Sequence, residues 1–181
     1  MRKAVLLCLF TLVLGGWASA QIPTSGNVFL GYSYYNTDLS SIDRANTNGW
    51  QASLEGKVLP WVGIVVDFSN HYGSQNFAVP CPPIRCSFNE DFTERNILFG
   101  PRVSVSVRKL RPFAEALFGA GHVNVHHVNS DTSFATALGG GVDYKLLAIL
   151  AWRLQGDYVQ TRFFNNTQNN VRLSTGIVVR F

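Results

Sequence analysis

The chain has 181 residues and a formal charge of +4, from 15 Lys and Arg against 11 Asp and Glu. Charged residues make up 14% of the chain, well below the roughly 25% of ordinary soluble domains. The basic residues are scattered singly, which argues against an extended nucleic-acid-binding patch. We expect one domain, with a surface that faces something apolar.

The first 20 residues have the three parts of a cleavable signal peptide. Residues 1–3 (MRK) are positively charged, residues 4–14 are apolar, and residues 18–20 (ASA) form a small-residue cleavage site. The apolar run is too short for a membrane-spanning helix. A lipoprotein cysteine is the alternative, but Cys8 lies inside the apolar run. We therefore expect a signal peptide at residues 1–20 and a mature barrel domain at residues 21–181.

Eight segments of the mature chain alternate in polarity and are separated by turn residues, which is typical of a transmembrane β-barrel. They cover residues 27–36, 49–59, 61–72, 94–107, 111–125, 133–146, 150–164 and 170–181. In the last segment, Val171, Leu173 and Ile177 share one face, while Arg172 and Ser174 share the other. We therefore predict an all-β fold, an eight-stranded antiparallel up-and-down transmembrane β-barrel.

The expected connections alternate in length. Those at residues 59–60, 108–110 and 147–149 are short, whereas those at 37–48, 73–93, 126–132 and 165–169 are mostly longer and polar. Outer-membrane barrels have short periplasmic turns and longer extracellular loops. With an even number of strands, both ends of the barrel are expected on the short-turn side.

Most charged residues of the expected strands lie opposite the apolar face. This inward set contains five acids and five bases: Glu55, Asp67, Glu115, Asp143 and Asp157, with Lys57, Arg102, Arg153, Arg172 and Arg180. An eight-stranded lumen is just wide enough for side chains to fill it, and buried charges are tolerated when they are paired. We therefore expect a lumen plugged by ion pairs. A gated ion path or a proton relay through the same residues is the alternative.

Aromatic residues gather near both ends of the strands, as in the interfacial girdles of membrane barrels. Those near the short turns are Trp61, Phe113, Tyr144, Trp152 and Phe181, and those near the loops are Tyr34, Trp50, Tyr72, Phe134 and Phe163. Ordinary core packing is the alternative. The girdles predict that outer-membrane lipid surrounds the barrel.

Cys81 and Cys86 bracket a proline-rich stretch of the expected 73–93 loop. Exported chains meet an oxidising compartment, so a local disulfide is the favoured pairing. A metal site is the alternative, but the chain has no second cysteine pair, and His71 is distant in sequence.

Histidines near strand ends are the candidate catalytic or metal-binding groups. His71 ends the third segment, while His122, His126 and His127 end the fifth, close to Asp131. His122 and His126 share strand parity and would bind a metal with a loop carboxylate. Solvated loop positions explain the same spacing. We therefore predict no catalytic residue, no metal, no cofactor and no enzymatic activity.

Four motifs resemble bacterial outer-membrane β-barrel proteins of the OmpA-type transmembrane class. They are RPFAEALFGAG at residues 111–121, ALGGGVDY at 137–144, LQGDY at 154–158 and RLSTGIVVRF at 172–181. The resemblance implies a location in the outer membrane, and biogenesis by periplasmic chaperones and the barrel-assembly machinery. Phe181, with Val179 and Ile177, resembles the C-terminal signal that this machinery recognises, although the family often has an aromatic residue where Val179 stands. We expect no peptidoglycan-binding domain.

The sequence leaves several functions open. A closed barrel that is structural or displays loops to an unknown surface ligand is favoured by the paired lumen and by the long 73–93 connection. A narrow channel for small solutes is the second hypothesis, and a rim-located membrane enzyme the third. A soluble exported barrel, with its charges outside, is a fourth.

Overall fold

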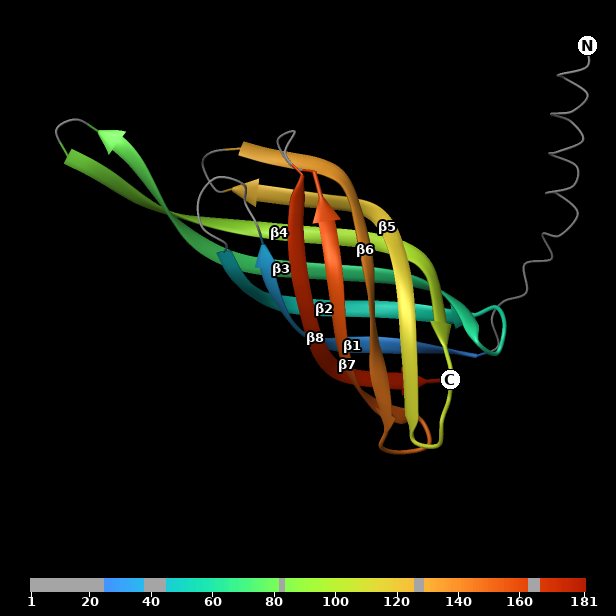
Figure 1. The fold of residues 1–181 in the computed structure, drawn as a ribbon. Helices are drawn as coiled ribbons and strands as arrows, with labels where there is room; N and C mark the ends of the chain where they lie inside the picture. Colours follow the sequence, from blue (N-terminus) through green and yellow to red (C-terminus); the bar gives the residue numbers. More distant parts are fainter. Residues whose placement is uncertain (1–24, 38–44, 82–83, 126–128, 163–166) are drawn as a thin grey trace, which may run out of the picture.

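The computed structural model describes residues 25–37, 45–81, 84–125, 129–162 and 167–181, and the side chains of residues 45, 75–90, 125 and 129 lie outside this description. The strands are β1 (Gly26–Thr37), β2 (Ala45–Lys57), β3 (Val62–Cys81), β4 (Ile84–Ser104), β5 (Leu110–Val125), β6 (Asn129–Lys145), β7 (Leu150–Thr161) and β8 (Gln168–Arg180). Each strand pairs antiparallel with the next, and β8 pairs with β1 to close the barrel (Figure 1). The prediction of an eight-stranded up-and-down barrel is confirmed. The expected signal peptide lies outside the described residues.

Within the described ranges, no helix is long and apolar enough to cross a membrane.

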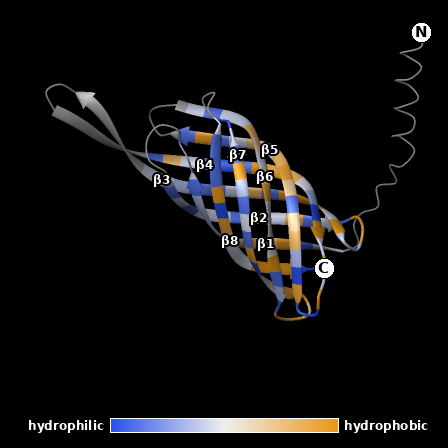
Figure 2. Cartoon of the chain, viewed as in Figure 1, coloured by the Kyte–Doolittle hydropathy of each residue, from blue (hydrophilic) through white to orange (hydrophobic). Residues whose placement is uncertain are grey.

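The outer wall of the barrel is apolar and the lumen is polar. Leu30 on β1 and Leu138 on β6 are 61% and 68% exposed, whereas Arg172 on β8 is fully buried. Hydrophobic and hydrophilic positions alternate along the strands (Figure 2). This is the reverse of a water-soluble barrel, so the wall is built for an apolar environment.

The short connections follow β2, β4 and β6 and lie at the same end of the barrel as the C-terminus (Figure 1). We call this the short-turn end and the opposite end the loop end. Tight backbone bonds close the turns, as in the 3.0 Å bond from Val58 N to Val62 O. The predicted short turns are therefore present where the sequence placed them.

One prediction about the loop end is wrong. The segment 73–93 is not a loop, because β3 and β4 stay paired up to Cys81 and Ile84. Beyond Tyr72 and Phe92 the described residues of β3 and β4 pair with neither β2 nor β5, so this part is a two-stranded ribbon that projects from the barrel (Figure 1). Its polar, proline-containing sequence lacks the apolar face that marked the other strands.

Candidate functional site: the charged lumen

The ten predicted lumen residues all lie on the inner side of the barrel. Most are buried, while the side chains of Lys57 and Arg180, near the short-turn end, keep 12% and 23% of their surface exposed. All ten take part in ion pairs. The structure thus brings together side chains from seven strands, β2 to β8.

Glu55 on β2 is the centre of the group at the short-turn end. Its carboxylate lies 2.8 Å from Lys57 Nζ, 3.1 Å from Arg102 Nη1 and 3.1 Å from Arg111 Nη2. Asn27 Nδ2 donates a further bond of 2.8 Å. The three cations and the amide offset the loss of water around this buried carboxylate. Arg111 was absent from the predicted set because it stands at the start of its segment.

Two arginines and two phenylalanines stack beside this group. The guanidinium of Arg102 lies 4.4 Å from the ring centroid of Phe113, and that of Arg153 lies 4.6 Å from the same ring. Arg153 is also 5.0 Å from the ring centroid of Phe29. Such contacts stabilise desolvated cations. Phe113 is 7% exposed and faces the lumen, so its assignment to the outer girdle was wrong; it shares the parity of Glu115.

A second group crosses the middle of the lumen. Arg172 on β8 bonds Asp157 on β7 and Asp67 on β3, each at 2.8 Å. Gln155 donates to both Glu115, at 2.8 Å, and Asp157, at 2.9 Å. Because Glu115 also bonds Arg102, the hydrogen bonds run without a break from Lys57 to Asp67.

Asp143 anchors the remaining two predicted bases. It bonds Arg153 at 2.7 Å and Arg180 at 3.4 Å. Between and beyond the ionic groups, the lumen holds a buried apolar cluster: Tyr35, Val65, Leu98, Leu117, Ala135, Ala137 and Val159.

Glu94 is a lumen acid that the sequence reasoning missed. Tyr35 Oη donates to Glu94 Oε1 at 2.9 Å, and Asn96 Nδ2 donates to the same atom at 3.3 Å. Among the described residues, no Lys, Arg or His lies within ion-pair distance of it, and its Oε2 is buried without a hydrogen-bond partner. Glu94 shares strand parity with Asn96 and Arg102, a signal that would have placed it inside.

His71 is not a strand-end histidine in contact with the loops. It is fully buried, its Nε2 lies 2.8 Å from Ser33 Oγ, and its ring stacks on Tyr35 with 4.7 Å between centroids. β3 continues ten residues beyond it to Cys81, which is why the strand-end prediction was wrong. His122 Nδ1 lies 2.7 Å from Thr132 Oγ1 on the outer wall. His126 and His127 lie outside the described residues.

The cysteine pair and the C-terminal residues have defined backbone positions. Cys81 is paired with Ile84 and Cys86 with Val79. In the backbone register Cys86 is two residues away from the position opposite Cys81. The side chains of both cysteines lie outside the described residues, and the disulfide stays a prediction. Ile177, Val179 and Phe181 are exposed in a row on the outer wall. Phe181 N and O both bond the backbone of Gly26, but recognition by an assembly machinery stays a prediction.

The family follows from the whole chain. The family model described as "Outer membrane protein beta-barrel domain" matches residues 4–181. The chain belongs to this family. Its location in the outer membrane agrees with the apolar wall, and its fold agrees with solved structures of outer-membrane proteins.

Three of these structures illustrate the likeness of this outer membrane β-barrel domain. Neisserial surface protein A has a TM-score of 0.68 at 15% identity, over 86% of this chain and 97% of the other. OprG of Pseudomonas aeruginosa has a TM-score of 0.60 at 8% identity, over 88% of this chain and 97% of the other. Ail, the attachment invasion locus protein of Yersinia pestis, has a TM-score of 0.59 at 14% identity, over 87% of this chain and 98% of the other. At these identities the likeness shows the fold alone. A search of curated proteins found no match.

Proposed function

We propose that the protein is a plugged barrel that acts through what its loop end displays at the cell surface. The observation that carries this is the unbroken chain of hydrogen bonds and ion pairs through the lumen from Lys57 to Asp67. An ion that entered would have to displace side chains that are already paired. Breaking a buried pair costs about 3 to 5 kcal/mol, so a steady ion path is disfavoured.

The projecting ribbon of β3 and β4 is the element best placed to meet a partner. These are the two longest strands, with 20 and 21 residues. Their pairing continues beyond the last contact with β2 and β5, which carries the ribbon away from the barrel wall. Ail, which shares the fold, has been solved with the heparin analogue sucrose octasulfate. That complex is a precedent for ligand binding on a barrel of this fold.

Planar-bilayer recording of the refolded barrel tests the plug. We expect a silent bilayer for the natural protein. Steady conductance steps would overturn the proposal in favour of a narrow channel. A shortened variant that lacks residues 75–90 tests whether the ribbon meets the partner. It keeps the lumen and should stay silent in the bilayer, but it should lose the binding of the natural protein to cell surfaces.

Catalysis is not part of the proposal. The protease OmpT of Escherichia coli shares the fold, with a TM-score of 0.51 at 8% identity over 88% of this chain and 97% of the other. We propose that the present barrel is not an enzyme, because the described histidines are engaged by Ser33 or Thr132 rather than by a carboxylate. Incubation with denatured casein should leave the casein intact, and cleavage that survives mutation of His71 and His122 would point to a different site.

We further propose that periplasmic chaperones and the barrel-assembly machinery deliver the chain to the membrane. The exposed apolar row of Ile177, Val179 and Phe181 at the end of β8 supports this. Removal of Phe181 should lower the amount of folded barrel in cells without lowering the yield of refolding into detergent. Equal losses in both assays would make Phe181 a stability residue instead.

A further inference from the structure

The outer wall at the loop end carries a group of aromatic and amide side chains on β1, β2 and β3. We call this group the aromatic–amide patch; it consists of Tyr32, Tyr34, Trp50, Tyr72, Asn36, Asn46 and Asn48. Tyr72 is 54% exposed and Trp50 is 39% exposed. Tyr34 is the register partner of Asn48, and Asn48 that of Tyr72. The patch is therefore one continuous surface across three strands.

Hydrogen bonds hold the rings of this patch in place. Tyr34 Oη donates to Asn46 Oδ1 at 2.7 Å, and Tyr32 Oη donates to Asn48 Oδ1. Asn36 Nδ2 donates to Asn46 Oδ1 at 2.6 Å. Each of these bonds uses the oxygen of Asn46 or Asn48. The amide nitrogens of the two residues keep their donors for a ligand, since the hydrogen bonds of the described residues use only the oxygens.

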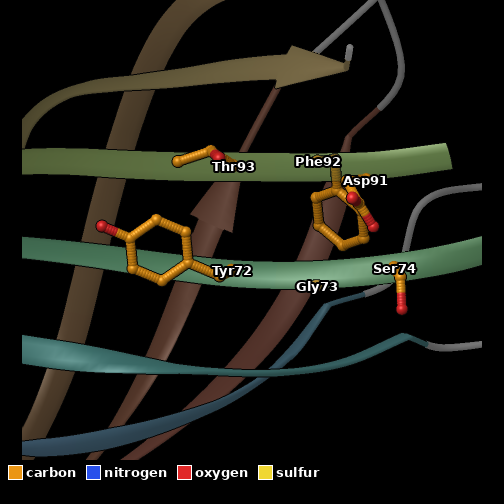
Figure 3. Close-up of a pocket in the computed structure, with 6 residues that line it drawn as sticks. All are labelled: Tyr72, Gly73, Ser74, Asp91, Phe92 and Thr93. Carbon is orange, nitrogen blue, oxygen red and sulfur yellow. The ribbon is translucent and has the colours of Figure 1, made fainter.

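A hollow of about 490 Å³ borders the patch where the ribbon leaves the barrel. It is lined by Tyr72, Gly73, Ser74, Asp91, Phe92 and Thr93. Figure 3 shows Tyr72 on β3 beside Thr93 on β4, its register partner, with Asp91 further along β4. A flat ring, two hydroxyl groups and a carboxylate thus surround one space.

These groups match the chemistry of a sugar. One face of a pyranose ring is a flat array of C–H groups that packs on an aromatic ring, while its hydroxyls need donors and acceptors. The amides of Asn46 and Asn48 supply donors, and Asp91 supplies acceptors. A simple interfacial girdle needs the aromatic rings but neither the amides nor the carboxylate.

The position of the patch indicates which sugar it meets. Along the same strands toward the short-turn end, the wall becomes apolar, with Leu30 and Leu54 exposed. The patch therefore lies just above the hydrocarbon layer, facing sideways into the membrane surface. We propose that it binds the saccharide headgroup of a glycolipid in the outer leaflet. This depends on the outer-membrane location and not on whether the lumen conducts.

The test compares a glycolipid with an anionic lipid that carries no sugar. The refolded full-length mature barrel is placed in phosphatidylcholine vesicles that contain either lipopolysaccharide with its core sugars or cardiolipin, which is anionic but has no saccharide headgroup. We expect the sugar-bearing lipid to bind at least about five-fold more tightly, and the released core oligosaccharide to compete for it. Equal affinity for both lipids would overturn the proposal.

Variants assign the preference to the patch. Tyr72→Leu keeps an apolar side chain but removes the flat ring, and Asn46→Ala with Asn48→Ala removes the donors; both should abolish the preference for sugars. Tyr144→Leu is the matched control, an exposed tyrosine near the short-turn end, and should keep it. A shift in electrophoretic migration on heating checks that each variant folds. If a patch variant does not fold, Asp91→Asn, in the hollow, replaces it in the binding test. A preference that survives in all folded patch variants would exclude this site.

Discussion

Arg172 and Asp67 face each other across the lumen, with Arg172 Nη1 2.8 Å from Asp67 Oδ1, although 105 residues separate them. Their strands, β8 and β3, are not neighbours in the barrel. The pair therefore spans the interior instead of following the wall. Arg172 reaches Asp157 on the adjacent β7 as well, so one guanidinium links three strands.

Asp67→Asn should weaken the barrel at this crossing. The substitution leaves Arg172 buried with one carboxylate instead of two, and breaking a buried pair costs about 3 to 5 kcal/mol. We expect a loss near the lower limit, about 3 kcal/mol, since Asp157 remains. The free energy of unfolding in urea, measured in detergent micelles, checks this. Arg95→Gln on the outer wall is the control and should have little effect on the free energy of unfolding. If both variants lose the same stability, the ion pair between Arg172 and Asp67 does not contribute specifically.

Glu94→Gln should raise the free energy of unfolding, the opposite of the effect expected for Asp67→Asn. Glu94 is buried without a basic partner in the described part of the chain, so the substitution removes an uncompensated charge while Tyr35 still has an oxygen to donate to. We expect a gain of about 1 kcal/mol at neutral pH. Glu55→Gln, which removes the partner of three cations, is the comparison and should destabilise. If Glu94→Gln also destabilises the barrel, as Glu55→Gln should, then Glu94 has a cation partner when the barrel is in the membrane.

The alternation of polarity was enough to predict the eight strands and the inner position of ten charged residues. Side chains two residues apart share a face whatever the tertiary structure, so Arg172 and Arg180 could be assigned from sequence alone. Phe113 shows the limit of that reasoning. Its parity placed it inside, but its position near a strand end suggested a girdle, and the stacking with Arg102 and Arg153 that holds it inside is invisible in the sequence.

Pairing across the lumen could not be predicted. Whether Arg172 meets Asp67 depends on the shear and tilt of the closed barrel, which no local pattern encodes. The projecting ribbon was missed for another reason. Residues 75–81 and 84–90 pair with each other, but their polar, proline-containing sequence lacks the apolar alternation by which the other strands were found.

The cysteines offer a test of the ribbon tip. The register places Cys86 two residues from the position opposite Cys81, and an exported chain meets an oxidising compartment, where a local disulfide forms. We expect mass spectrometry of unreduced peptides to show the bond. Cys81→Ser with Cys86→Ser should then speed protease cleavage near the tip while the unfolding midpoint of the barrel stays unchanged. Two free thiols in the exported protein would contradict the disulfide. The backbone hydrogen bonds between β3 and β4 would then stabilise the ribbon tip alone.

Gly31 on β1 is predicted to be intolerant of any side chain. A β-carbon there would lie 2.7 Å from Phe29 Cζ and 2.3 Å from the carbonyl oxygen of Thr175 on β8. The ring of Phe29 would have to move from its place beside Arg153, and the seam between β1 and β8 would have to widen. We expect Gly31→Ala to cost about 1 to 3 kcal/mol, as overpacking does, measured as the free energy of unfolding.

Gly156→Ala on β7 is the matched control for Gly31→Ala. A β-carbon at residue 156 meets only Leu173 Cδ2, at 3.4 Å, so the same chemical change adds an ordinary contact. Because alanine in place of glycine also restricts the unfolded chain, this variant should be neutral or slightly stabilising. If the two variants unfold at the same urea concentration, the close approach of Phe29 to Gly31 does not limit the stability of the seam.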